Sequence, residues 1–237
     1  MELTTIFFDL DGTLLPMDEE IFIQAYFRGL VMKLAPHGYE QEGLVKSIWT
    51  GVKAMVKNTG ECTNEEMFWK AFTDIYGEKC RQDEGIFEEF YVNEFQKVQK
   101  MCGFDAKAAE VIAELKRMGY RLVLATNPLF PAIATESRVR WAGLSPEDFV
   151  YISTYENSNH SKPNLDYYKE IMDKIGVTAK ECLMVGNNVD EDMIAGELGM
   201  RTFLCPKCLI NKQGKNISAY RQGELSDLPV YVGSLKE

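Results

Sequence analysis

The first strand of this chain ends in a pair of aspartates, and this pair limits both its fold and its chemistry. The apolar run Ile6 to Phe8 is followed by Asp9, Leu10 and Asp11, and then by a Gly-Thr turn. Residues i and i+2 of a strand share one face, so the two carboxylates can meet at the carboxyl end of the strand. Open α/β sheets bind their ligands at that edge. Because two close carboxylates repel each other, the pair indicates a metal site with a nucleophile and an acid.

The composition is that of an ordinary soluble globular protein of 237 residues, with 46% apolar and 26% charged residues. The net charge is −10 and no long lysine or arginine cluster is present, so nucleic acid is not an expected partner. No apolar run approaches the roughly 20 residues that span a bilayer. The residues before the first strand do not have the charged and apolar regions of a signal peptide, so none is expected. We therefore expect a cytoplasmic protein that does not bind membranes.

The six cysteines are expected to be reduced thiols in that compartment. Cys205 and Cys208 have the spacing of metal ligands, but no second cysteine pair or cysteine-histidine pair accompanies them. The sequence therefore does not favour a zinc site.

Helical periodicity dominates the chain after Pro16. Apolar residues recur at spacings of three and four in the segments 21–34, 44–56, 67–75 and 87–98. Thr63 and Glu66 form a capping-box pattern at the start of the third segment. We predict an all-helical unit of about four helices, inserted directly after the first strand.

From Asp105 onward, helix and strand patterns alternate. The predicted helices cover 106–118, 131–141, 166–175 and 191–198, and the predicted strands cover 120–125, 149–153, 182–185, 202–204 and 228–232. This alternation predicts an α/β fold, a Rossmann-like parallel sheet with helices on both faces.

The first strand must join this sheet in order to be buried, although the helical unit separates it from the other strands. We therefore predict a catalytic core formed by 1–15 and 104–237 and an inserted helical cap domain formed by 16–103. The cap is expected to lie over the strand ends as a lid.

Polar residues follow the later strands in a specific order. Thr126 ends a predicted strand, Lys162 lies in a Ser-Lys-Pro segment before a helix, and Asn187 and Asp192 follow the next strand. Together with the segment from Asp9 to Thr13, these residues form four motifs along the chain. In this order they resemble the haloacid dehalogenase-like hydrolase superfamily, in its phosphatase type with a helical cap of the first class. The resemblance covers the whole chain.

The resemblance implies roles for five residues. Asp9 would attack phosphorus and form an aspartyl-phosphate, and Asp11 would act as the acid and base. Thr126, Asn127 and Lys162 would hold the phosphoryl group, with Thr126 and Lys162 counted as catalytic. Dehalogenating relatives lack the second aspartate, so Asp11 favours phosphoryl transfer.

The resemblance also implies a Mg²⁺ site, formed by Asp9, Asp11, Asn187 and Asp192. The family usually has aspartate where this chain has Asn187, and this is the one clear departure from its pattern. An asparagine oxygen can bind Mg²⁺ but adds no charge, so we expect a weaker site. Whether Asn187 or the nearby Asp190 takes this position stays open at the level of the sequence.

These motifs predict a Mg²⁺-dependent phosphatase that hydrolyses a small phosphorylated metabolite. Two alternatives stay open: a phosphomutase that uses the same residues, and a catalytically weak regulatory protein that binds a phosphorylated ligand. The sequence identifies neither the substrate nor the oligomeric state.

Overall fold

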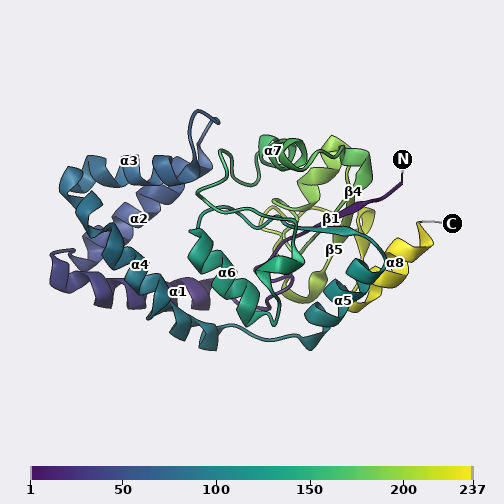
Figure 1. Ribbon diagram of the computed structural model, residues 1–237, viewed down its shortest axis with the longest axis horizontal. Helices are drawn as coiled ribbons and strands as arrows, with labels where there is room; N and C mark the ends of the chain where they lie inside the picture. Colours follow the sequence, from purple (N-terminus) through teal and green to yellow (C-terminus); the bar gives the residue numbers. More distant parts are fainter. Residues whose placement is uncertain (1, 236–237) are drawn as a thin grey trace.

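A single parallel sheet forms the centre of the molecule. The computed structural model describes residues 2–235 and arranges six strands in the order β3-β2-β1-β4-β5-β6 (Figure 1). Their bounds are β1 Thr5–Phe8, β2 Arg121–Leu124, β3 Tyr151–Ile152, β4 Cys182–Gly186, β5 Arg201–Leu204 and β6 Arg221–Gln222. All neighbouring strands are parallel. The predicted parallel α/β sheet is therefore confirmed.

The central strand β1 brings the ends of three strands into register. Phe8 lies opposite Leu124 of β2 on one side and opposite Val185 of β4 on the other. The residues that follow each of these positions therefore leave the sheet at the same edge.

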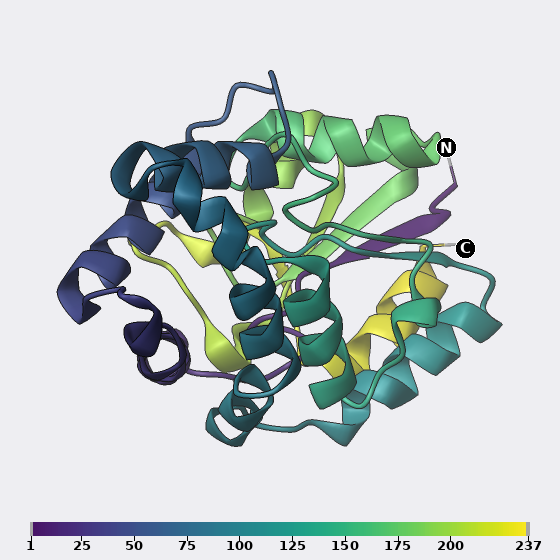
Figure 2. The ribbon, with the colours of Figure 1, turned by 60° about the vertical axis from the view of Figure 1, so that its left-hand side comes forward.

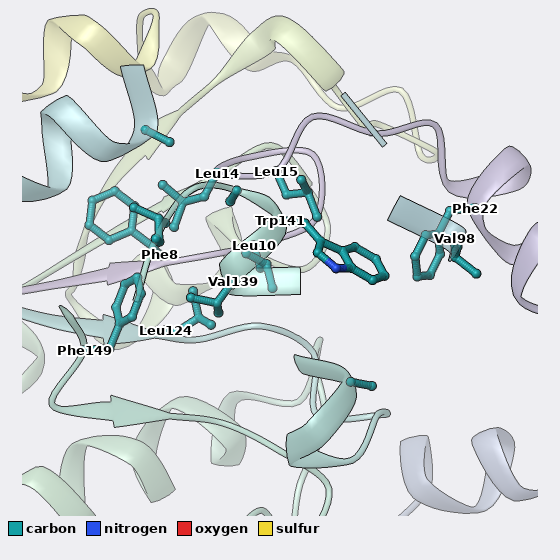
Figure 3. Close-up of a cluster of buried hydrophobic side chains, with 14 of the residues drawn as sticks. Phe8, Leu10, Leu14, Leu15, Phe22, Val98, Leu124, Val139, Trp141 and Phe149 are labelled. Carbon is teal, nitrogen blue, oxygen red and sulfur yellow. The ribbon is translucent and has the colours of Figure 1, made fainter. Parts of the chain in front are cut away.

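Helices cover both faces of the sheet because alternate strand residues point to opposite sides. Ile6 and Phe8 belong to the larger buried cluster, whereas Phe7 packs in a second cluster with Tyr167 and Tyr168. The helices of the first face are α5 (Ala106–Arg117), α6 (Ala132–Trp141) and α8 (Leu228–Ser234), and that of the second is α7 (Leu165–Ile175). Figure 3 shows Phe8, Leu124, Val139 and Phe149 lying together in the first cluster.

The predicted helical insertion lies between β1 and β2. It consists of α1 (Glu19–Leu34), α2 (Gln41–Val56), α3 (Asn64–Tyr76) and α4 (Glu84–Val92). Thr63 and Glu66 form both hydrogen bonds of the predicted capping box at the start of α3. Figures 1 and 2 show these helices gathered at the side of the sheet toward which β1 runs.

No helix within residues 2–235 is long and apolar enough to cross a membrane.

Two predicted helices are shorter than expected. The segment 87–98 divides into α4 and a 3₁₀ segment, Phe95–Met101. Asn93 caps the end of α4, where its N–H still donates to Glu89 O. Gln96 Nε2 donates to Tyr91 O, the carbonyl that a continued α-helix would offer to the N–H of Phe95. The segment 191–198 forms only a 3₁₀ helix, Met193–Leu198.

The prediction of a strand at 228–232 was wrong, because this segment forms α8. Leu228 and Val232 are fully buried while Val230 is 78% exposed, so burial follows the four-residue spacing of a helix. Pro229 lies in the first helical turn, where its missing N–H costs nothing. The last strand of the sheet is instead the short β6, which the sequence did not indicate.

Two glycines in the inserted helices differ in how much space surrounds them. A Cβ atom at Gly51 of α2 would lie 2.4 Å from Cδ2 of Phe68 on α3, whereas one at Gly85 of α4 would meet no atom within 4 Å. We expect Gly51→Ala to lower the free energy of unfolding by about 1–3 kcal/mol through overpacking. Gly85→Ala should raise it by up to about 1 kcal/mol, because alanine favours the helix. Urea denaturation measures both values. Stabilisation by Gly51→Ala would contradict this packing of α2 on α3.

Candidate active site

Asp9 directly follows β1 and is held at the edge of the sheet. Its backbone N–H donates to Val185 O at 2.9 Å, which continues the pairing of β1 with β4. The residue is 8% exposed. Lys162 Nζ lies 2.9 Å from Asp9 Oδ1, and the Thr13 hydroxyl donates to Oδ2 across a longer 3.4 Å. One carboxylate oxygen is thus firmly held and the other only loosely.

Lys162 joins two carboxylates that follow different strands of the sheet, β1 and β4. Its Nζ lies 2.9 Å from Asp9 Oδ1 and 2.6 Å from Asp192 Oδ1, with no exposed side-chain surface. Burial opposes the charge of Lys162, but Asp192 and Asp9 outweigh it and hold the lysine pKa well above its ordinary value. The lysine therefore stays protonated between the two acids.

Asp192 is fixed on both of its oxygens. Besides the contact of Oδ1 with Lys162, Oδ2 accepts a hydrogen bond from the Asn188 N–H at 2.9 Å. Burial raises the pKa of the Asp192 carboxyl, and the charge of Lys162 opposes that effect. A Cβ atom at Gly186 would lie 2.1 Å from Asp192 Oδ2, so only glycine leaves room for this carboxylate beneath the end of β4.

Asp11 lies beyond the end of β1 with one oxygen paired and one without a partner. Oδ2 forms an ion pair with Arg138, whereas the buried Oδ1 has no hydrogen-bond partner. Burial raises the pKa of Asp11, an effect that Arg138 opposes. A buried carboxyl oxygen without a partner is costly in a folded protein, and Asp11 as a whole lines the cavity beside Asp9.

Arg138 is the residue of this site that sequence reasoning missed. It belongs to α6, is 1% exposed, and its guanidinium stacks 4.5 Å from the centre of the Phe130 ring. Its Nε and its second terminal nitrogen donate to Ala134 O and to the Thr135 hydroxyl. The available signal was weak, because a lone arginine in a helix is normally an exposed residue.

Asn187 faces Asp9 through a shared hydroxyl group. The Thr13 hydroxyl lies 3.0 Å from Asn187 Oδ1 and 3.4 Å from Asp9 Oδ2. On the other side, Asn187 Nδ2 donates to Cys208 O at 2.6 Å. A Cβ atom at Gly12 would lie 2.3 Å from Asn187 Nδ2, which explains the glycine in the first motif. The amide therefore directs its oxygen toward Asp9 and its nitrogen toward the Cys208 loop.

Asp190, the other candidate for this position, is directed elsewhere. Its Oδ1 pairs with Lys215 at 2.9 Å, and it does not belong to the lining of the cavity beside Asp9. The geometry therefore favours Asn187 over Asp190 as a ligand.

Thr126 and Asn127 follow β2 and line the same cavity as Asp9. The Thr126 carbonyl accepts hydrogen bonds from the Ser153 hydroxyl at 2.7 Å and from the Tyr167 hydroxyl at 2.8 Å, which fixes this turn. Asn127 Nδ2 donates to Glu191 at 3.2 Å, while its Oδ1 is buried without a partner. The structure thus brings all seven predicted site residues to one edge of the sheet, with Lys162 and Asp192 behind Asp9.

The donor atoms around Asp9 fit a magnesium ion with low ligand charge. Mg²⁺ prefers oxygen ligands, and the Asp9 carboxylate and Asn187 Oδ1 both face the Thr13 hydroxyl. Asp192 has both oxygens engaged by protein donors, so it suits an indirect contact. Within residues 2–235, no three acidic, histidine or cysteine side chains converge on one point. An ion here would therefore depend on the neutral amide of Asn187.

Comparison with known proteins decides the family. A family model described as haloacid dehalogenase-like hydrolase matches residues 3–198. The chain belongs to the haloacid dehalogenase-like hydrolase family. Pyrophosphatase PpaX of Bacillus velezensis is 24% identical over 199 residues, which cover 84% of this chain and 81% of that protein.

Solved structures of this hydrolase fold cover nearly the whole chain. A HAD phosphatase from Thermococcus onnurineus matches with a TM-score of 0.60 and 20% identity, over 98% of both chains. The putative HAD-hydrolase YfnB from Bacillus subtilis, bound to magnesium, matches with a TM-score of 0.57 and 20% identity, over 98% of this chain and all of the other. At these identities the likeness establishes the fold and confirms the fold predicted from the sequence. The family model confirms the predicted family.

The ion pair of Arg138 with Asp11 can be tested against a surface pair on the same helix. We expect Arg138→Met to lower the free energy of unfolding by about 2–3 kcal/mol, because it leaves a mostly buried carboxylate without its cation. This is below the cost for a fully buried pair, since Asp11 keeps 24% of its side-chain surface exposed.

The matched control is Arg140→Met, which removes the pair with Glu136. Both of these side chains are at least 40% exposed, so the change should stay within about 0.5 kcal/mol. Urea denaturation at neutral pH gives both values. Equal effects of the two substitutions would contradict the burial and pairing of Arg138.

Proposed function

We propose that this hydrolase is a Mg²⁺-dependent phosphatase that cleaves a small phosphorylated metabolite through an aspartyl-phosphate at Asp9. The observation that carries the proposal is the placement of Lys162 between Asp9 and Asp192, directly behind the cavity that Asp9 lines. The lysine fixes Asp9 at the edge of a cavity that Asp9 itself lines, which suits a nucleophile aimed at a bound phosphoryl group. The named relative PpaX, a pyrophosphatase, supports phosphoryl transfer as the chemistry.

In the first step, Asp9 attacks phosphorus and the bond from phosphorus to the leaving oxygen breaks. Asp11 gives its proton to that oxygen, so the product leaves as a neutral alcohol. The position of Asp11 supports this role, because Asp11 lines the same cavity as Asp9.

In the second step, water attacks phosphorus of the aspartyl-phosphate while Asp11, now ionised, accepts its proton. The bond from phosphorus to Asp9 breaks, which releases phosphate and restores both acids. Arg138 would keep Asp11 oriented during both proton transfers through its contact with Oδ2.

Three residues are proposed to hold the phosphoryl group. Lys162 offsets its negative charge, and Thr126 and Asn127 supply hydrogen bonds at the end of β2. Their support is the rigid turn at Thr126, whose carbonyl accepts two buried hydroxyl groups.

Mg²⁺ would be held by the Asp9 carboxylate, the Asp11 carbonyl and Asn187 Oδ1, with Asp192 in an indirect contact. When bound, it supplies positive charge that stabilises the transferring phosphoryl group. We further propose the division into a core of 1–15 and 104–237 and a cap of 16–103, in which the cap excludes bulk water from the intermediate.

One observation favours a second candidate, a catalytically weak protein that binds a phosphorylated ligand. Asn187 places a neutral amide, tied to Cys208 O, where the family usually has a carboxylate. Release of phosphate from a generic aryl phosphate at saturating Mg²⁺ separates the two candidates. Recovery of the phosphoryl group on substrate rather than as free phosphate would indicate a phosphomutase.

Asp9→Asn tests the nucleophile. We expect it to lower the rate of phosphate release by at least about a thousandfold, because the amide cannot form the covalent intermediate. Cooperative unfolding should be retained, since the variant preserves the size of the side chain. Asp173→Asn, an exposed change on α7, is the control and should keep the wild-type rate. Wild-type rates in Asp9→Asn would exclude Asp9 as the nucleophile.

Asn187→Asp tests the metal site with two readouts. The added charge should lower the Mg²⁺ concentration that gives half the maximal rate. When a chelator has removed Mg²⁺, the free energy of unfolding of the same variant should be about 1–3 kcal/mol below that of the wild type. The reason is that the new carboxylate cannot donate a hydrogen bond to Cys208 O. An unchanged Mg²⁺ requirement would argue that Asn187 does not bind the ion.

A further inference from the structure

The cavity beside Asp9 has a polar end and an aromatic end. Its volume is about 350 Å³, and its polar end is formed by the candidate site residues at the strand ends. The inserted helices supply the opposite wall, which is largely aromatic. Six of its rings belong to Phe22, Tyr26, Phe27, Trp49, Phe68 and Trp69.

Positive charge is scarce in this cavity. Among the residues of the described chain that line it, Lys212 is the one cation, and its side chain is 76% exposed and 3.9 Å from Glu19. Lys162 forms ion pairs with Asp9 and Asp192 and does not line the cavity. Glu19 and Glu191 also line the cavity and add negative charge.

The polar groups of the aromatic wall are neutral. The hydroxyls of Tyr26 and Tyr91 lie 3.0 Å apart and hydrogen bond to each other. Burial raises the pKa of Tyr26 to about 12, so this hydroxyl keeps its proton at neutral pH. The wall therefore offers ring surface and hydroxyl groups but no charge that would balance an anion.

These features set the chemistry of the leaving group. A ring buried against aromatic side chains gains both from loss of water contact and from edge-to-face contacts. An anionic leaving group would lose its hydration without gaining a cation, and it would face Glu19 and Glu191. We infer that the preferred substrate is a phosphate monoester of an uncharged, ring-bearing alcohol. This inference rests on the proposed phosphatase function, and it distinguishes the chain from its relative named as a pyrophosphatase.

The direct test compares kcat/KM for three substrates at saturating Mg²⁺. 2-Naphthyl phosphate has an apolar leaving group, whereas 2-phosphoglycolate and inorganic pyrophosphate have anionic ones. We expect kcat/KM for 2-naphthyl phosphate to exceed that for either anionic substrate by about 50-fold or more. This ratio corresponds to the free energy gained by burying roughly 100 Å² of ring surface. An equal or greater kcat/KM for either anionic substrate would overturn the inference.

Two valines on α2, one helical turn apart, give a matched pair of variants. Val52 lines the cavity, whereas Val56 does not and is 41% exposed. Val52→Lys should lower the preference for 2-naphthyl phosphate over 2-phosphoglycolate by about tenfold, because it adds the missing cation. Val56→Lys should leave that ratio within about twofold. Equal effects of the two changes would count against the inference.

Trp49→Ala provides a second variant if Val52→Lys does not fold. Trp49 lines the cavity but is 42% exposed, so its truncation leaves most of the core intact. We expect kcat/KM to fall about fivefold or more for 2-naphthyl phosphate and to change little for 2-phosphoglycolate. An equal fall for both substrates would contradict the role of the aromatic wall.

The outcomes separate this inference from the proposed function. Hydrolysis that depends on Asp9 but favours an anionic substrate would leave the phosphatase function standing and overturn the inference. If none of the three substrates is hydrolysed, the proposed function fails, and binding then decides the inference. Quenching of tryptophan fluorescence should show tighter binding of 2-naphthyl phosphate than of 2-phosphoglycolate, and the reverse order would overturn it.

Discussion

The contact of Lys162 with two carboxylates is the constraint on which the rest of the site depends. Asp9 comes from the end of β1 and Asp192 from the segment after β4, and the lysine reaches both from the loop before α7. One ammonium group between two buried carboxylates leaves a net negative charge, which a divalent cation offsets when it is bound. The same contact fixes Asp9 at the edge of the cavity that it lines.

The second acid of the first motif is controlled by a different cation. Arg138 comes from α6 on the other side of β1, and its guanidinium is fixed by its own helix and by the Phe130 ring. Each of the two aspartates therefore has its own buried cation, which suits two carboxylates with different roles. Beyond them the wall that the inserted helices supply is largely aromatic, and Lys212 is the one cation among the described residues that line the pocket.

The fold and the main site residues could be predicted because both follow from local patterns. Parallel strands share one carboxyl edge, so polar residues after successive strands must converge there, as Asp9, Thr126 and Asn187 do. Arg138 could not be predicted, because its burial depends on contacts between α6 and the loop after β1. The segment Leu228–Val232 was predicted as a strand because a short apolar run fits a strand or a helix equally well. The packing of Leu228 and Val232 in the core favours the helix.

The central claim is that Asp9 carries the phosphoryl group during turnover, and the most direct measurement is to capture that group. Protein mixed with an aryl phosphate and Mg²⁺ would be quenched in acid, digested and mapped by mass spectrometry. The account predicts phosphate on the peptide that contains Asp9, removable by hydroxylamine as expected for an acyl phosphate. Phosphate on another residue, or steady turnover without phosphate on Asp9, would contradict it.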